Sequence, residues 1–230
     1  MKNLIFYLFL WALPLAAAGQ NCASLYSYLK EGATLQYTNY DNRGSVESVM
    51  TQRVSRIEEK SDTLVATFDV SSVDAKGKSF AQNSMPVKCF EGVLYMDMRS
   101  LIPPQKENAQ AQDISVEMQG NDLVFPAGMQ VGQTLPDCTV ELITRMGGVP
   151  VMTIKYTLRN RKVEAREKIT TPAGTFDCLK ITYEFEYKLL GTRTMQSEYW
   201  FAPEVGMVRS VNRDKRGKEM SKMELTQFKI

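Results

Sequence analysis

The sequence predicts an all-β protein with one short N-terminal helix, built as an antiparallel meander that forms a curved sheet or half-barrel of ten or more strands. Two observations predict this class. Apolar and polar residues alternate with a period of two in many segments, and short runs that contain glycine separate these segments. Successive side chains of a strand point to opposite faces, so each alternating segment indicates one buried and one solvated face.

The chain begins with a segment that is typical of an export signal. Lys2 precedes an apolar run from Leu4 to Leu15, and the small residues 16–19 follow. Such a run is too short for the roughly 20 residues that a membrane-spanning helix needs. We expect residues 1–19 to be a signal peptide, with cleavage after Ala18 as the alternative, and residues 20–230 to form a single exported antiparallel β domain. The location predicted is periplasmic or extracellular in a bacterium.

A lipoprotein is the alternative that Cys22 suggests. Gln20 and Asn21 argue against it, because they stand where lipoprotein processing requires small residues, and Gly19 stands where leucine is usual. No other segment approaches the roughly 20 apolar residues of a membrane span, so we expect no transmembrane span after the signal.

The first element after the signal is expected to be a helix of two turns between Cys22 and Lys30. Its apolar residues Leu25, Tyr28 and Leu29 share one helical face, and Gly32 provides the stop.

From there on the period is two, and the segments 64–71 and 152–158 are typical of half-buried strands. The clearest strand is 180–188. Its odd positions are Ile181, Tyr183, Phe185 and Tyr187, while its even positions are lysine, threonine and glutamate. This strand has an aromatic face and a charged face.

Five short runs predict the turns between strands, because glycine accepts the positive φ of hairpin turns and Asp or Asn stabilises them. They are residues 41–44, 74–77, 90–92, 204–206 and 214–217. The polar segment 100–113, which begins near Pro103 and Pro104, is expected to be a long connection that divides the sheet into two halves of similar size.

Four cysteines follow the signal, and an oxidising compartment allows them to form one or two disulfides. They are Cys22, Cys89, Cys138 and Cys178. Three complete pairings exist, of which we favour Cys22 with Cys89 and Cys138 with Cys178. Buried free thiols are the alternative for Cys89 and Cys178, because both lie in strand-like segments.

The charge pattern excludes a nucleic-acid-binding surface, because 28 basic and 26 acidic residues are spread over both halves of the chain. Two local basic groups stand out, at 159–162 (Arg159, Arg161 and Lys162) and at 213–218. Both are expected to be solvated hairpin tips.

Several chemistries are missing from the sequence. It contains no histidine, which removes the usual base of Ser and Cys hydrolases and the commonest neutral metal ligand. It has no nucleophile elbow, phosphate loop, dinucleotide fingerprint or calcium loop, so no metal and no cofactor is predicted. Catalysis by two carboxylates is not excluded, because it needs no histidine, and the candidate residues of a glycan hydrolase are Glu184, Glu186 and Glu198. Their spacing among lysines favours a solvated charged face instead.

Two segments carry a family resemblance. They are AGTFDCLKI (Ala173–Ile181) and YWFAPEVGMVRS (Tyr199–Ser210), and CFEGVLYMDM (Cys89–Met98) is compatible with them. Together they resemble exported bacterial proteins grouped as "domain of unknown function 3108"-like, most firmly over residues 162–210. The resemblance implies an extended or half-closed antiparallel sheet outside the cytoplasm. It transfers no activity, catalytic residue or ligand residue to this chain.

These observations leave three hypotheses, ranked in this order. The first is a non-enzymatic exported cell-envelope protein that binds an apolar or amphipathic, lipid-like ligand in the concave face of its sheet. The second is a structural or interaction protein of the envelope that acts through a sheet edge or loops. The third is a carboxylate-dependent glycan hydrolase. The candidate ligand-binding residues are Tyr183, Phe185, Tyr187, Tyr199 and Phe201. Each of the 13 methionines is expected to pack in the core; for the set, a pocket between the curved sheet and the short helix is the second interpretation, because methionine also lines surfaces that accept varied apolar partners.

Overall fold

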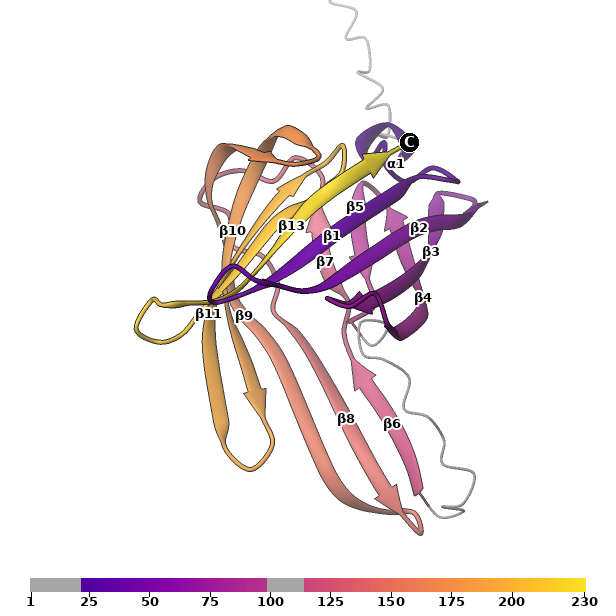
Figure 1. Cartoon of the computed structure of the whole chain (residues 1–230). Coiled ribbons are helices and arrows are strands. Elements are labelled where there is room, and N and C mark those ends of the chain that lie inside the picture. The colour runs from indigo at the N-terminus through magenta and orange to yellow at the C-terminus, as the bar shows by residue number, and fades with distance from the viewer. Residues whose placement is uncertain (1–21, 99–113) are drawn as a thin grey trace, which may run out of the picture.

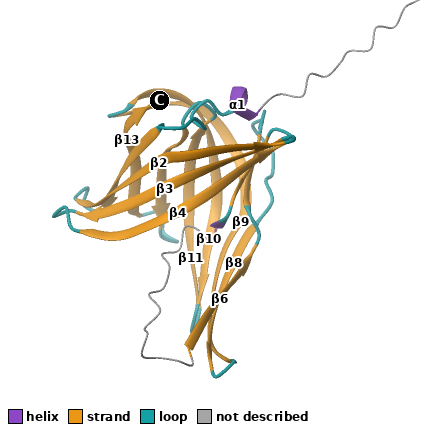
Figure 2. Cartoon of the chain, turned by 90° about the vertical axis from the view of Figure 1, so that its right-hand side faces the viewer, coloured by secondary structure: helices purple, strands orange, loops and turns teal. Residues whose placement is uncertain are grey.

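A computed structural model describes residues 22–98 and 114–230 as one curved sheet of 13 antiparallel strands with a single helical turn (Figures 1 and 2). The predicted signal peptide 1–19 and the long connection 100–113 lie outside the described residues. The elements are α1 (Cys22–Leu25), β1 (Thr34–Asp41), β2 (Val46–Lys60), β3 (Thr63–Asp74), β4 (Ser79–Phe90), β5 (Val93–Met96), β6 (Ile114–Gly120), β7 (Leu123–Pro126), β8 (Cys138–Met146), β9 (Val149–Thr171), β10 (Gly174–Lys188), β11 (Thr192–Ala202), β12 (Gly206–Arg213) and β13 (Glu219–Lys229). The all-β class with a curved antiparallel meander is therefore confirmed.

Two meanders make up the sheet. The order is β6-β8-β9-β10-β11-β12-β13-β1-β2-β3-β4-β5-β7, so β1 to β5 form one run and β8 to β13 form the other. The first strand joins the last, because β1 pairs antiparallel with β13 from Thr34 opposite Lys229 to Asp41 opposite Ser221.

The two edge strands explain why the sheet curls. β6 and β7 stand at opposite ends of the strand order, yet only Asn121 and Asp122 separate them in sequence. The three Cα–Cα steps from Gly120 to Leu123 span at most about 11 Å, so the two ends of the sheet must approach each other. The lower parts of β6, β8 and β9 extend beyond this region as a long arm (Figures 1 and 2).

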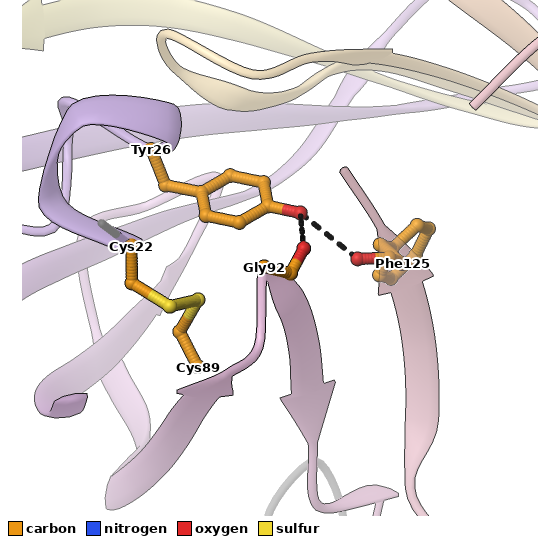
Figure 3. The surroundings of a disulfide bond; sticks show 5 residues. All are labelled: Cys22, Tyr26, Cys89, Gly92 and Phe125. Atoms are coloured by element: carbon orange, nitrogen blue, oxygen red, sulfur yellow. Dashed lines mark hydrogen bonds between the residues drawn. A yellow bond between two sulfur atoms is a disulfide. The ribbon is translucent and has the colours of Figure 1, made fainter. Parts of the chain in front are cut away.

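The helix predicted over Cys22–Lys30 is wrong in length, because α1 has only four residues. After it the chain turns, so that Tyr26, Tyr28 and Leu29 are all buried, which one face of a regular helix could not achieve. The Tyr26 hydroxyl donates to the carbonyl oxygens of Gly92 at 3.2 Å and Phe125 at 2.9 Å (Figure 3). The N-terminal segment is thereby fixed to the β4–β5 turn and to β7.

A disulfide fixes the same segment to β4. The structure contains the predicted Cys22–Cys89 bond, with the two Cα atoms 5.9 Å apart (Figure 3). The predicted pairing of Cys138 with Cys178 is wrong, since both are buried free thiols. On β9, Cys138 lies opposite Leu158 and Cys178 opposite Glu167, which places them about 30 Å apart along the strand.

Three hairpin turns share one design that the sequence predicts. Asp41, Asp74 and Asp214 each close a turn, and in each the Oδ1 atom accepts two backbone N–H groups from residues two and four positions later. Gly217, in the last of these turns, has a φ of 79°, which glycine adopts without strain. The basic group 213–218 surrounds this turn, as predicted.

Only glycine fits at position 206, for two reasons. Its φ is 78°, and a Cβ atom there would meet Cζ of the buried Tyr28 at 3.2 Å. We expect Gly206→Ala to lower the free energy of unfolding by roughly twice as much as Gly217→Ala, which suffers only the backbone strain of about 1–2 kcal/mol. Urea unfolding of both variants measures this, and equal losses would contradict the packing of Tyr28 against the β11–β12 turn.

The two free thiols give a second test. Burial raises the pKa of the Cys138 thiol to about 11 and that of Cys178 to about 12, so neither forms the reactive thiolate at neutral pH. Iodoacetamide should label no cysteine in the native protein, two in denaturant, and all four in denaturant with a reductant. Mass spectrometry counts the adducts. Labelling of the native protein, or four adducts without reductant, would contradict the structure.

Candidate functional site

The concave side of the sheet contains a partly open cavity of about 250 Å³. Eleven of the strands and the N-terminal segment contribute to its wall, which consists mainly of aromatic and aliphatic side chains. The aromatic lining residues are Tyr28, Tyr37, Phe68, Phe125, Tyr183, Phe185, Tyr199 and Phe201. Protein interiors normally leave few voids larger than a water molecule, so a cavity of this size is a feature of the fold rather than a packing defect.

Methionines form a second part of the wall. Six of the 13 methionines line the cavity, namely Met50, Met85, Met96, Met98, Met207 and Met223. The unbranched, polarisable methionine side chain adjusts to irregular apolar shapes at little cost. The wall can therefore accommodate apolar groups of varied outline.

The aromatic residues are ordered by mutual packing. The ring of Phe125 stacks on Phe201 with centroids 5.0 Å apart and on Tyr199 with centroids 5.6 Å apart. Phe125 comes from the edge strand β7, whereas the other two come from β11. This stack holds the β7 end of the sheet against its middle.

Four of the five predicted ligand-binding residues lie in the cavity wall. Tyr183 and Phe185 reach it from β10, and Tyr199 and Phe201 from β11. Tyr187 does not belong to the lining. It packs instead against Tyr156, with ring centroids 5.3 Å apart, farther along the β9–β10 ribbon. The period of two identified the face correctly but not how far the cavity extends along it.

Arg161 is the functional candidate that sequence reasoning missed. The prediction of a solvated hairpin tip is wrong, because Arg161 lies inside β9, is only 2% exposed and lines the cavity. It donates from Nη1 to the carbonyl oxygen of Pro136 at 2.7 Å and from Nη2 to that of Val124 at 3.0 Å. Its guanidinium lies 5.2 Å from the centroid of the Phe125 ring.

A β-bulge turns Arg161 inward. Thr182 pairs with Lys162 and Glu184 with Arg159, so Asn160 and Arg161 together lie opposite a single residue of β10. The extra residue reverses the alternation of β9, because Leu158 and Arg161 are both buried although they are three positions apart. Asn160 adopts the left-handed backbone conformation of the bulge, with a φ of 55°, and donates its N–H to Asp137 Oδ1 at 3.0 Å.

The candidate carboxylates of a hydrolase lie on the opposite, outer face of the sheet and are paired with cations. Arg159 Nε lies 2.9 Å from Glu184 Oε2, and its Nη2 lies 3.1 Å from Glu186 Oε2. Glu198 contacts Lys180 at 2.6 Å and Arg213 at 3.3 Å.

The electrostatics of Glu198 differ from those of a general acid. Burial raises its pKa, but the hydrogen bonds from Lys180 and Arg213 outweigh burial, and the pKa is lowered overall. A general acid needs a raised pKa. In the two described ranges, 22–98 and 114–230, no group of three or more His, Cys, Asp or Glu side chains could hold a metal ion.

The family of the chain follows from its match to a family model. The DUF3108-like model matches residues 30–225. The chain belongs to the DUF3108-like family. The matched region of this DUF3108-like protein contains every residue of the cavity wall except Tyr28, and it includes the segments 173–181 and 199–210 on which the resemblance was based.

Two solved structures are similar to this DUF3108-like protein. One is a candidate exported protein with a YmcC-like fold from Bacteroides fragilis, at 23% identity and a TM-score of 0.71, covering 87% of this chain and 97% of that one. The other is a candidate lipoprotein from Parabacteroides distasonis, at 22% identity and a TM-score of 0.70, covering 87% of this chain and 96% of that one. At these identities the likeness shows a shared fold. No curated protein matches the chain significantly.

The outer-face ion pairs predict an acid dependence of stability. A carboxylate with a lowered folded pKa contributes stability above its unfolded pKa of about 4.5 and loses it as the pH falls through the folded pKa. We expect Glu198→Gln to cost about 1 kcal/mol of unfolding free energy at pH 7 and almost nothing at pH 3. Urea unfolding at both pH values measures the difference. The matched change at the exposed Glu47 should cost little at either pH, and a cost for Glu198→Gln that persists at pH 3 would contradict the ion-pair account.

Proposed function

We propose that this DUF3108-like protein is a non-enzymatic exported protein of the bacterial cell envelope that binds an apolar or amphipathic ligand in the cavity of its concave face. The observation that carries the proposal is the cavity itself, about 250 Å³ in volume and walled by aromatic residues and methionines. Ligand sites are typically concave and mostly apolar, with a few polar groups that orient the ligand.

The cavity lowers the stability of the fold, and this supports a role in binding. An apolar void forfeits the packing contacts of its walls and lowers stability roughly in proportion to its volume. Apolar cavities of about 150 Å³ bind small apolar molecules from water. An apolar ligand would restore these contacts in the wall formed by residues such as Met50 and Phe185.

A non-enzymatic role is supported by the distribution of reactive groups. The only ionisable side chains in the cavity wall, as far as the chain is described, are four tyrosines and Arg161. Burial raises the pKa of Tyr28, Tyr37 and Tyr199, which keeps their hydroxyls protonated. No acid and base are therefore paired within this wall.

An envelope location is supported by two observations. The first residues of the chain are typical of an export signal. The two proteins that share the fold are described as exported and as a lipoprotein. None of the described helices is long and apolar enough to cross a membrane.

A neutral fluorescent probe, N-phenyl-1-naphthylamine, tests the proposal. We expect its fluorescence to rise on binding to the purified protein, and Met50→Trp, which fills the cavity, to weaken this binding at least tenfold. Met220→Trp is the matched control, because Met220 is 42% exposed and lies outside the wall. Equal binding by both variants, or no binding by the unmodified protein, would refute the cavity as the ligand site.

A second candidate function is attachment to another envelope protein through the arm. β6 is an edge strand, and Val116, Met146, Val149, Val151 and Met152 are exposed apolar residues on it and on the neighbouring β8–β9 hairpin. Edge strands pair readily with strands of other chains. A photo-crosslinking residue at position 116 should then capture one defined partner in the native host, whereas one at position 220 should not. Absence of an adduct at position 116 would count against this candidate.

A further inference from the structure

Arg161 is the single charged side chain in the cavity wall formed by the described residues. Every other contributor is apolar, aromatic or neutral and polar. Arg159, two positions earlier in β9, shows where a basic residue of this strand would otherwise lie, since it pairs with carboxylates on the outer face. The bulge at Asn160 thus transfers one positive charge from the solvated face to an apolar interior.

The charge of Arg161 is incompletely compensated. Its two hydrogen bonds go to carbonyl oxygens, which carry only partial charges, and no described carboxylate lies within 4.0 Å of its nitrogen atoms. A guanidinium has five N–H donors, so three remain for other acceptors. Burial lowers the pKa of Arg161, and the charge of the Asp137 carboxylate, which makes no ion pair with it, offsets this lowering only in part. An isolated buried charge is costly unless an anion pairs with it.

The groups around Arg161 are suited to an anion that carries an apolar chain. The Phe125 ring lies beneath the guanidinium and stacks on Tyr199, so the cation borders the aromatic part of the wall. Tyr183 and Tyr199 lie in the same wall as Arg161, and burial raises the pKa of both hydroxyls, which keeps them protonated as donors. The methionines supply an apolar lining for a chain.

We propose that the cavity binds an alkyl carboxylate, with the carboxylate paired to the Arg161 guanidinium and the alkyl chain lying against the methionine and aromatic wall. This inference rests on the proposed function and names its ligand class. A planar carboxylate accepts two parallel N–H bonds from a guanidinium, which makes it the acceptor best suited to arginine. The pair supplies the anion that the buried guanidinium lacks.

A matched ligand series tests the headgroup without altering the protein. Decanoate, 1-decanol and decyltrimethylammonium share one chain length and differ in charge. We expect isothermal titration calorimetry at pH 8 to show decanoate binding at least tenfold more tightly than 1-decanol, because hydrogen bonds to charged groups are the stronger ones. Decyltrimethylammonium should bind more weakly than both.

Two arginine variants from the same strand assign the effect. Arg161→Gln should abolish the preference for decanoate while 1-decanol still binds. Arg159→Gln should leave the preference unchanged, because Arg159 belongs to the outer face. If Arg161→Gln fails to fold, the ligand series on the unmodified protein still decides the question.

The outcomes separate this inference from the proposed function. Equal affinity for decanoate and 1-decanol, or a preference for decyltrimethylammonium, would overturn the role of Arg161 but leave an apolar-ligand site intact. A preference for decanoate that survives Arg161→Gln would also overturn it. If neither decanoate, 1-decanol nor the neutral naphthylamine probe binds, both the inference and the proposed function are wrong.

Discussion

Burial of the Arg161 guanidinium is the interaction on which the arrangement of the cavity depends. Its two hydrogen bonds connect β9, in one meander, to Val124 in the opposite edge strand β7 and to Pro136 in the connection before β8. The same group borders the cavity and supplies its charge. A buried guanidinium is stable only if its N–H groups have acceptors. Its bonds to Val124 and Pro136 therefore hold β9 close to β7, and its remaining N–H groups favour binding of an anion.

The N-terminal segment also supports the curvature of the sheet. The Cys22–Cys89 disulfide and the bonds from the Tyr26 hydroxyl to Gly92 and Phe125 anchor this segment over β4, β5 and β7 (Figure 3). Tyr28 then completes the cavity wall and fills the space left by Gly206. Pairing of β1 with β13 joins the two meanders. The cavity wall, the N-terminal segment that anchors it and the charge of Arg161 thus come from parts of the chain that are far apart in sequence.

Much of the fold could be predicted from local chemistry. Period-two alternation identified the inward face of β10, and the Asp and Gly turns marked the hairpins, because both signals act within a few residues. The position of Arg161 could not be predicted, since a one-residue bulge reverses the two faces of β9 and only pairing with β10 reveals it. The length of α1, the register that separates Cys138 from Cys178, and the exclusion of Tyr187 from the cavity are likewise set by tertiary contacts. Composition contributed less, because the abundance of methionine indicated core packing first and an adaptable apolar pocket only as a second interpretation.

The central claim is that the cavity is a site for a bound amphiphile, and mass spectrometry of the exported protein tests it most directly. The chain would be produced with its own signal, purified without detergent, and measured under native and then denaturing conditions. We predict a native mass above that of the polypeptide, an excess that disappears on denaturation, and a released molecule with an alkyl chain and a carboxylate. A native mass equal to that of the polypeptide alone would contradict the claim.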